Sequence, residues 1–205
     1  MNALFLVPRG AEEAAVRRAG VRVCALPAGA RAAEALPEGL ATERIIVAGL
    51  CGALAPLSPE TVVVYEAVID DARSYRCDAA PAAALAGSVR AVGYTSDHIV
   101  TSAREKRELG LRTGASVVDM EGTPLAAALE AKGIRFSMLR VVSDDALHDL
   151  PPLGGALDAA GTLRPERVAL AFARRPFAAA RFARDGMRAL AALERVVRAL
   201  NALPG

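Results

Sequence analysis

The sequence predicts an α/β layered domain, in which strands and helices alternate along one chain. Short apolar runs of strand length recur and are separated by segments with helical spacing. The chain has 205 residues, of which 53% are hydrophobic and 23% charged, which is enough material for one core. We find neither an internal repeat nor an interior linker. Residues 1–205 are therefore predicted to form a single domain, with 151–205 as a helical C-terminal extension.

The N-terminal part is predicted to alternate short strands with short helices. The strands are expected at residues 3–7, 21–25 and 45–48, and the helices at 11–19 and 29–36. Gly20 ends the first helix, and the third strand runs into the glycine turn Gly49-Leu50-Cys51-Gly52.

The middle of the chain contains the clearest strand, at 61–69, because β-branched residues dominate it. An Ala-rich stretch with weak structural signals follows to about residue 88. Strand-like pieces return at 89–94 and 97–100. A charged helix is predicted at 102–109, ended by Gly110.

The last strands are expected at 115–119, which runs into Met120-Glu121, and at 135–142, which runs into Ser143-Asp144-Asp145. Thr123-Pro124 between them resembles an N-cap followed by proline at the first helical position, and Gly133 ends that helix. After Pro151-Pro152 a helical tail follows, with Pro176 as a point at which it could divide into two helices.

Composition excludes several function classes. No apolar run has the ~18 residues of a membrane span, and the N-terminus lacks a signal pattern, so a cytoplasmic protein is expected. The three cysteines have no CxxC spacing, and only two histidines occur, which disfavours a disulfide framework, a metal site and Ser-His-Asp catalysis. Without GxGxxG or a Walker sequence, no nucleotide cofactor is expected. Titratable chemistry should therefore come mainly from carboxylates.

Basic residues gather in the tail, where residues 164–198 hold nine Arg against Glu166, Asp185 and Glu194. One interpretation is a solvated helix face, and another is a surface that contacts anionic lipid. No aromatic residues alternate with the basic ones, so nucleic acid is not an expected partner.

Three acids, Glu13, Glu121 and Asp144, each follow the carboxyl end of a predicted strand and lie near a helix start. Ligands of open α/β sheets bind at that edge, so the three carboxylates are candidates to converge. Each could equally be an ordinary partner of a helix dipole. Two carboxyls with separated pKa values can cleave a glycosidic bond, and a third can hold ribose hydroxyls. The pattern by itself indicates a carboxylate-based hydrolase.

Two motifs carry a family resemblance, Val117-Val118-Asp119-Met120-Glu121-Gly122 and Leu139-Arg140-Val141-Val142-Ser143-Asp144. With them the chain resembles the nucleoside phosphorylase and nucleosidase superfamily, which includes methylthioadenosine/S-adenosylhomocysteine nucleosidases. Thr95-Ser96-Asp97-His98-Ile99-Val100 is similar to the family's base-binding segment. The resemblance implies a three-layer fold with a central mixed sheet flanked by helices. It also implies a nucleoside substrate and release of its base.

The resemblance assigns roles to individual residues. Asp144 would donate a proton or strong hydrogen bond to the purine imidazole, and Glu121, beside Met120, would hold the ribose hydroxyls. Ile99 and Val100 would contact the base.

Cys51 and Gly52 would form the wall on which the base lies. Glu13 would activate water, and Glu12 would be its solvated neighbour, because we assign Val16 to the apolar face that Glu13 shares. The catalytic residues expected from the resemblance are therefore Asp144 and Glu13.

Two departures favour water over phosphate as nucleophile. The phosphorylases carry Arg and Ser where this chain has Val47 and Leu50, and an apolar pair cannot neutralise a phosphate dianion. Arg9 could still supply a cation, although a role as an exposed turn residue is the stronger interpretation. The N-terminal part is also shorter than in most relatives, which could open the pocket to a large substrate or indicate a degenerate site.

The tail resembles that of the hopanoid-associated branch of this superfamily at Leu150-Pro151-Pro152 and Arg174-Arg175-Pro176. This resemblance implies adenosylhopane as the substrate. The Arg-rich helix could then contact a membrane, or it could pack on the domain or a dimer mate through Phe172, Phe177, Phe182, Met187 and Leu190. We also expect a homodimer or larger homo-oligomer. The alternatives are a methylthioadenosine, S-adenosylhomocysteine or futalosine hydrolase, a purine nucleoside phosphorylase, or a catalytically silent nucleoside-binding module.

Overall fold

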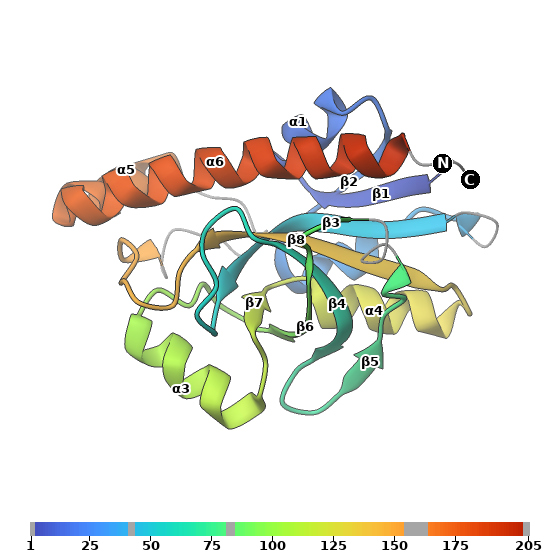
Figure 1. Cartoon of the computed structure of the whole chain (residues 1–205), viewed down its shortest axis with the longest axis horizontal. Coiled ribbons are helices and arrows are strands. Elements are labelled where there is room, and N and C mark those ends of the chain that lie inside the picture. The colour runs from blue at the N-terminus through green and yellow to red at the C-terminus, as the bar shows by residue number, and fades with distance from the viewer. Residues whose placement is uncertain (1–2, 41–43, 81–84, 154–163, 203–205) are drawn as a thin grey trace.

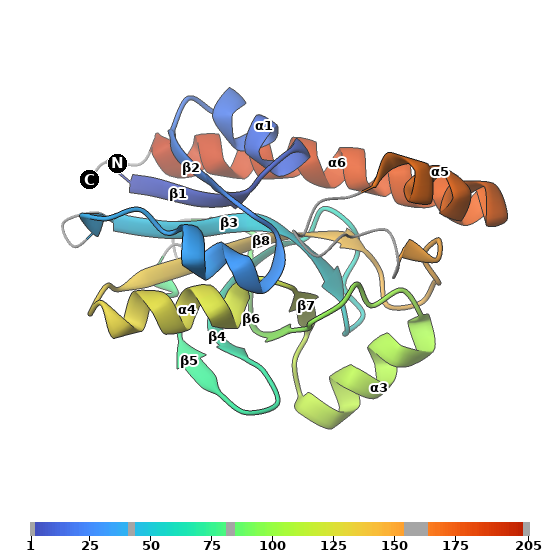
Figure 2. The same cartoon turned by 180° about the vertical axis from the view of Figure 1, so that it is seen from behind.

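A mixed β-sheet forms the centre of the protein, and helices cover both of its faces (Figures 1 and 2). The computed structural model describes residues 3–40, 44–80, 85–153 and 164–202. The strands are β1 (Ala3–Pro8), β2 (Arg22–Leu26), β3 (Arg44–Ala53), β4 (Val62–Ile69), β5 (Ser74–Arg76), β6 (Val89–Thr95), β7 (Val117–Asp119) and β8 (Phe136–Asp144). The helices are α1 (Ala11–Arg18), the 3-10 helix η1 (Gly29–Ala35), α3 (Ala103–Thr113), α4 (Gly122–Ala131), α5 (Pro165–Arg174) and α6 (Pro176–Asn201). The expected class, a mixed sheet flanked by helices, is confirmed.

Strand pairing closes part of the sheet into a ring. The path β2-β1-β3-β7-β6-β4-β5 is joined by β8, which pairs with β3 and with β4. β3, β7, β6, β4 and β8 are thus each bonded to two others of the set. β8 runs parallel to β3, whereas β7 runs antiparallel to the end of β3, where Gly52 pairs with Val118. β3 can bridge both neighbours because it extends to Ala53, further than the predicted strand at 45–48.

The strands near the centre are apolar on both sides because helices cover both faces. In β1, Phe5 and Val7 pack toward α1 and α6, whereas Leu4 and Leu6 pack in the cluster that contains Leu125 of α4. This alternation follows from the two-residue period of a strand. Both faces of β1 are therefore core, and its carboxyl end is held where α1 begins.

Three local predictions were wrong. Residues 97–100 form a loop after β6 and pair with no strand among the described residues. Gly110 lies inside α3, which continues to Thr113 and ends at Gly114, whose φ of 71° is the left-handed conformation that glycine favours. α4 begins at Gly122 with Glu121 in the N-cap position, so Thr123 is already helical. In addition, β5 lies in the stretch whose signals were weak.

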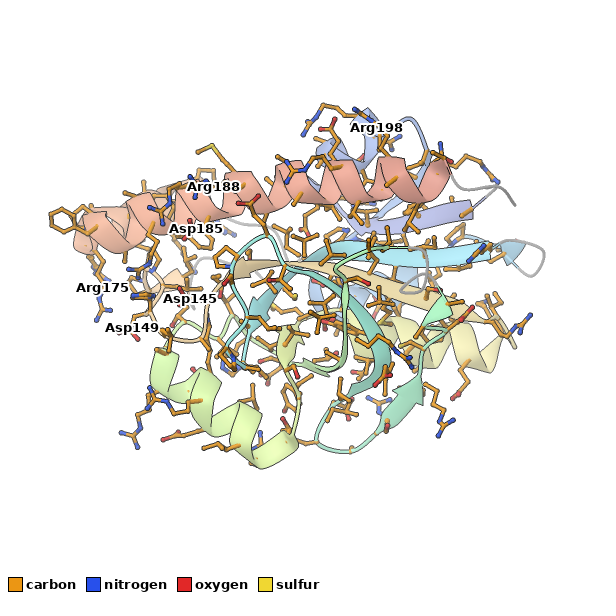
Figure 3. All side chains as sticks on the ribbon, viewed as in Figure 1. Asp145, Asp149, Arg175, Asp185, Arg188 and Arg198 are labelled. Atoms are coloured by element: carbon orange, nitrogen blue, oxygen red, sulfur yellow. The ribbon has the colours of Figure 1, made fainter. Side chains whose placement is uncertain are left out.

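The tail divides at Pro176 into α5 and α6, as predicted. α6 lies along the same face of the sheet as α1 (Figure 1) and packs on it through Ala189, Ala192, Leu193, Val196, Val197 and Leu200. Arg198, labelled in Figure 3, donates to the carbonyl oxygen of Arg18 at 3.1 Å and ties the helix to the end of α1.

Phe177 and Met187, two of the residues through which α6 could pack on the domain or on a dimer mate, are 90% and 66% exposed and do not belong to the core that α6 forms with the sheet. The Phe172 and Phe182 rings contact each other edge to face, with centroids 6.3 Å apart. No helix in the described part of the chain is long and apolar enough to cross a membrane.

Candidate active site

A cavity of about 250 Å³ lies where α1, the ends of β3, β7 and β8, and the loop after β6 meet. The ring of strands brings these segments together although β7 runs against β3. The lining residues are Glu12, Leu50, Cys51, Gly52, His98, Ile99, Val100, Val118, Asp119, Met120, Glu121, Ser143, Asp144, Leu150 and Phe182. The cavity thus joins carboxylates from three separate elements to an apolar wall.

Asp144 reaches the cavity from an irregularity at the end of β8. Cys51 pairs with Val142 and Gly52 with Asp144, so Ser143 is the extra residue of a bulge, a device that re-aims side chains. The Ser143 hydroxyl lies 2.5 Å from Asp144 Oδ1 and 3.1 Å from the Cys51 carbonyl oxygen. Lys106 of α3 forms an ion pair with the other oxygen, Oδ2. Both oxygens of Asp144 are therefore held.

Glu12 enters the cavity from the first turn of α1. Its Oε1 accepts a hydrogen bond from the Leu50 backbone N–H at 2.6 Å. A Cβ at Gly49 would lie 2.7 Å from the same oxygen, so the missing side chain at Gly49 makes room for the carboxylate. Burial, followed by the charge of Glu121, raises the pKa of Glu12 to about 7.

Glu13, by contrast, does not line the cavity, and its predicted place is taken by Glu12. Glu13 lies on the outer side of α1 and accepts a hydrogen bond from Arg17 Nε at 2.9 Å. This partner lowers the pKa of Glu13. The buried residues of this helix segment are Ala15, Val16 and Ala19, which share a face with Glu12 at i+3, i+4 and i+7. The positions of all three buried residues indicate Glu12 as the acid on the inner face of the helix. Val16 alone is compatible with either acid, because it lies four residues after Glu12 and three after Glu13.

Glu121 lies beside a buried guanidinium. Arg140 of β8 has no exposed side-chain surface, and its Nη2 is 3.3 Å from Asp119 Oδ2 and 3.6 Å from Glu121 Oε2. The Gly29 backbone N–H donates to Glu121 Oε1 at 3.0 Å. Burial raises the pKa of Glu121, and the charge of Arg140 opposes that rise. Arg140 thus partly neutralises a group of acids that would otherwise repel one another.

Arg140 makes no hydrogen bond through its side-chain nitrogens within the described residues. Burial lowers the pKa of this guanidinium, but the charges of Asp119 and Glu121 outweigh burial and raise the pKa overall. The Arg140 cation is therefore held by charge alone, at the distances of its two ion pairs.

The remaining predicted contact residues, Ile99, Val100, Met120, Cys51 and Gly52, all line the same cavity. Their roles toward a base stay predictions. Burial raises the pKa of the Cys51 thiol well above its ordinary value, which favours the neutral thiol over the nucleophilic thiolate at this wall of the cavity.

His98 stands beside these residues with a carboxylate on each side. Its Nδ1 lies 2.6 Å from Asp97 Oδ1 and its Nε2 lies 2.7 Å from Glu105 Oε1. Those two bonds raise the pKa of His98. Protonated His98 would then bring a positive charge to the rim of the cavity.

Arg9 and Val47, which the argument about phosphate involved, do not line the cavity. Arg9 is exposed, and Val47 is buried in the core on the face toward α4. Leu50 does line it. Within the described ranges, no three His, Cys, Asp or Glu side chains are grouped as ligands of a metal would be.

Sequence reasoning missed Lys106 and Arg140 as parts of the site. Arg140 is a single charge inside an apolar strand, and charged residues are almost never fully buried without a partner, so its position was a signal. Lys106 lies three residues from both Ala103 and Leu109, the other buried residues of α3. Leu150 and Phe182 also went unassigned, because nothing local connects them to the cavity.

Residues 88–163 match the model of the Phosphorylase superfamily. This segment contains β6, β7, α4 and β8, and with them all of the candidate residues except those on α1, β3 and α6. A search of curated proteins found no match.

Solved structures similar to the chain include three nucleoside-cleaving enzymes. Arabidopsis thaliana 5′-methylthioadenosine nucleosidase in its apo form is 16% identical with a TM-score of 0.70, over 100% of this chain and 98% of that one. Helicobacter pylori futalosine hydrolase is 12% identical with a TM-score of 0.71, over 98% and 97%. The 5′-methylthioadenosine/S-adenosylhomocysteine nucleosidase of S. pneumoniae is 16% identical with a TM-score of 0.69, over 98% and 100%. The chain therefore has the nucleoside phosphorylase-like fold.

Proposed function

We propose that the protein hydrolyses the N-glycosidic bond of an adenosine-type nucleoside and releases adenine. The observation that carries the proposal is the convergence of Glu12, Glu121 and Asp144 on one cavity from three separate elements. Glycoside hydrolysis needs an acid for the leaving group and a base for water, on a substrate held by its sugar. Three carboxylates with different surroundings can divide these tasks.

Asp144 is the proposed acid. It borders Gly52 and lines the same cavity as Ile99 and Val100, the residues expected to contact the base. Protonation of the purine imidazole withdraws electrons from the glycosidic bond, so adenine leaves as a neutral molecule.

Glu12 is the proposed base. A pKa of about 7 leaves this carboxyl basic enough to take a proton from water while about half of it is ionised at neutral pH. Glu121, on the same side as Glu12, would accept hydrogen bonds from the ribose hydroxyls and stabilise the positive charge that develops on the sugar.

Water is the proposed nucleophile, because the charges of the site oppose phosphate. The two buried cations already have acidic partners, since Arg140 is paired with Asp119 and Glu121 and Lys106 is paired with Asp144. A phosphate dianion would add negative charge next to Glu12. Hydrolysis therefore fits the site better than phosphorolysis.

The chemistry of the similar enzymes supports this reading, since each is named for cleaving a nucleoside. For the 5′-substituent, the apolar side chains of Leu150 and Phe182 at the cavity favour an apolar group. Adenosylhopane, which the resemblance of the tail implies, and 5′-methylthioadenosine both meet that condition. We propose adenosylhopane as the first substrate to test.

The test is release of base, measured by chromatography, from adenosylhopane, 5′-methylthioadenosine, S-adenosylhomocysteine and futalosine, each with and without phosphate. We expect turnover of at least one without phosphate, and a fall of about 10²-fold to 10⁴-fold in Asp144→Asn, as for loss of a general acid. Asp71→Asn, which removes an exposed acid, is the matched control.

Different outcomes of this test would overturn different parts of the proposal. A strict requirement for phosphate would make the protein a phosphorylase. Tight binding of these nucleosides without any turnover would make it a binding module.

A further inference from the structure

Lys106 is a buried lysine on an otherwise charged and solvated helix. It lies on the inner face of α3 with Ala103 and Leu109, and its side chain is 0% exposed. An ammonium group out of water is strongly unfavourable unless it is paired. A lysine on the buried face of this helix therefore implies either a strong partner for the ammonium or a function.

The partner of Lys106 is the proposed leaving-group acid. Lys106 Nζ forms an ion pair with Asp144 Oδ2 and donates to the Asp145 carbonyl oxygen at 2.7 Å. Two neighbours thus fix the ammonium, and one of them is a carboxylate with only 12% of its side chain exposed.

The two oxygens of Asp144 have different surroundings. Ser143 Oγ is hydrogen-bonded to Oδ1 at 2.5 Å. Oδ2, the oxygen that Lys106 contacts, lies next to Gly52: a Cβ atom added at Gly52 would be 3.0 Å from Oδ2. Gly52 lines the cavity. A proton arriving from Lys106 therefore reaches the oxygen nearest to the proposed wall of the base site.

We propose that Lys106 supplies the proton that Asp144 passes to the leaving adenine. This inference rests on the proposed function. As the bond between C1′ and N9 breaks, its electron pair goes to adenine, Asp144 transfers a proton from Oδ2 to the imidazole nitrogen, and Lys106 transfers one to Oδ2. Water forms the new bond to C1′ and gives its proton to Glu12. After the products leave, Lys106 regains a proton from solvent and Glu12 loses one to it.

A simpler role for Lys106 would be to orient Asp144 by charge alone. The two roles make different demands on the cation. Arginine keeps the charge but cannot release a proton in a protein, whereas methionine keeps the approximate volume and removes the charge. A leaving group that departs as a stable anion, such as p-nitrophenolate, needs no proton at all.

The experiment compares Lys106→Met with Arg107→Met, which removes an exposed cation from the next position of α3. We expect Lys106→Met to lower kcat for adenine release by about 10²-fold or more, and to change hydrolysis of p-nitrophenyl riboside by only a few-fold. Arg107→Met should leave both unchanged. Circular dichroism and adenine binding check that Lys106→Met is folded.

Lys106→Arg and the pH profile provide a second, independent readout. If Lys106 is the proton source, Lys106→Arg stays at least about 10²-fold slow in adenine release. In Lys106→Met, the pH profile of adenine release should change shape relative to the wild type, whereas hydrolysis of p-nitrophenyl riboside should keep the wild-type profile.

Recovery of adenine release in Lys106→Arg would overturn the proposal, and so would a uniform loss on both substrates or a pH profile that is lowered without a change of shape. A wild-type protein that cleaves no nucleoside would instead refute the proposed function. The two failures are therefore distinguishable.

Discussion

At the scale of single residues, the carboxyl group of Glu12 should control the response of the enzyme to pH. Burial and the charge of Glu121 raise its pKa to about 7, so the protonated form persists to neutral pH. Only the carboxylate can act as a base, and kcat/KM should therefore rise roughly tenfold per pH unit below about pH 7 and level off above it. A pH profile of kcat/KM measures this.

A fall of kcat/KM that begins only near pH 4.5, the ordinary pKa of a glutamate, would contradict the assignment of Glu12 as the base. His98 also lines the cavity and has a raised pKa, so the profile is repeated with His98→Gln. The acidic fall of kcat/KM should remain in that variant if Glu12 is its source.

Much of the candidate site at this scale could be predicted from the sequence. Asp144 and Glu121 were placed correctly in one cavity because each follows a strand within a recognisable motif. Glu12 and Glu13 are adjacent acids, and choosing between them required the whole inner face of α1 and the i+4 pair of Glu13 with Arg17. Lys106 and Asp144 are 38 residues apart, and local patterns do not show that they touch.

At the scale of elements, the course of β3 determines how the site is assembled. Gly49, on this strand, leaves space for Glu12 Oε1 and for the Arg140 guanidinium. We expect Gly49→Ala to displace Glu12 and lower kcat by about 10²-fold, the cost of a misplacement of about 1 Å. Steady-state kinetics measure the effect.

Gly186→Ala is the matched control for Gly49→Ala. Gly186 lies in α6, and a Cβ there would meet nothing within 4 Å. Alanine in a helix is favoured over glycine by up to about 1 kcal/mol, so this variant should be fully active and slightly more stable. Full activity of Gly49→Ala would show that Glu12 does not need its present position.

The length of β3 and the loop at 97–100 were not predictable in the same way. Gly49, Cys51 and Gly52 look like a turn in the sequence, yet pairing with β8 and β7 keeps them in a strand. Ile99 and Val100 have the composition of a strand, but in the part of the chain that the structure describes no strand pairs with them, and they line the cavity instead. Tertiary contacts overrode local preference in both segments.

At the scale of the whole molecule, α6 closes one face of the sheet and contributes Phe182 to the cavity. Leu193 is fully buried there. Leu193→Ala should lower the free energy of unfolding by about 2–5 kcal/mol, as large-to-small changes in a core do. Met187→Ala, at an exposed position of the same helix, should change it by less than about 0.5 kcal/mol.

Denaturant unfolding of the two variants measures both free energies. Equal effects at positions 187 and 193 would contradict the packing of α6 on the sheet. The outer face of α6, which includes the exposed Arg188 (Figure 3), does not enter this core. Contact of that face with lipid, or with a second copy of the chain, stays a prediction.

The ring of strands could not be predicted from the order of elements. Alternating strands and helices favoured an open sheet with all acids at one carboxyl edge. β7 instead runs antiparallel to the end of β3, and Glu121 reaches the cavity because the ring closes around it. The candidate site thus depends on long-range pairing, whereas the two-sided burial of β1 follows from its own apolar run.

Adenine release by Glu12→Gln and Glu13→Gln, assayed side by side on the substrate that the wild type cleaves best, tests the central claim most directly. The two changes remove the same charge from neighbouring positions of α1, one inside the cavity and one paired with Arg17 outside it. We expect kcat to fall by about 10²-fold to 10⁴-fold in Glu12→Gln and to stay within a few-fold of wild type in Glu13→Gln. The opposite pattern, with Glu13→Gln inactive and Glu12→Gln active, would contradict the account.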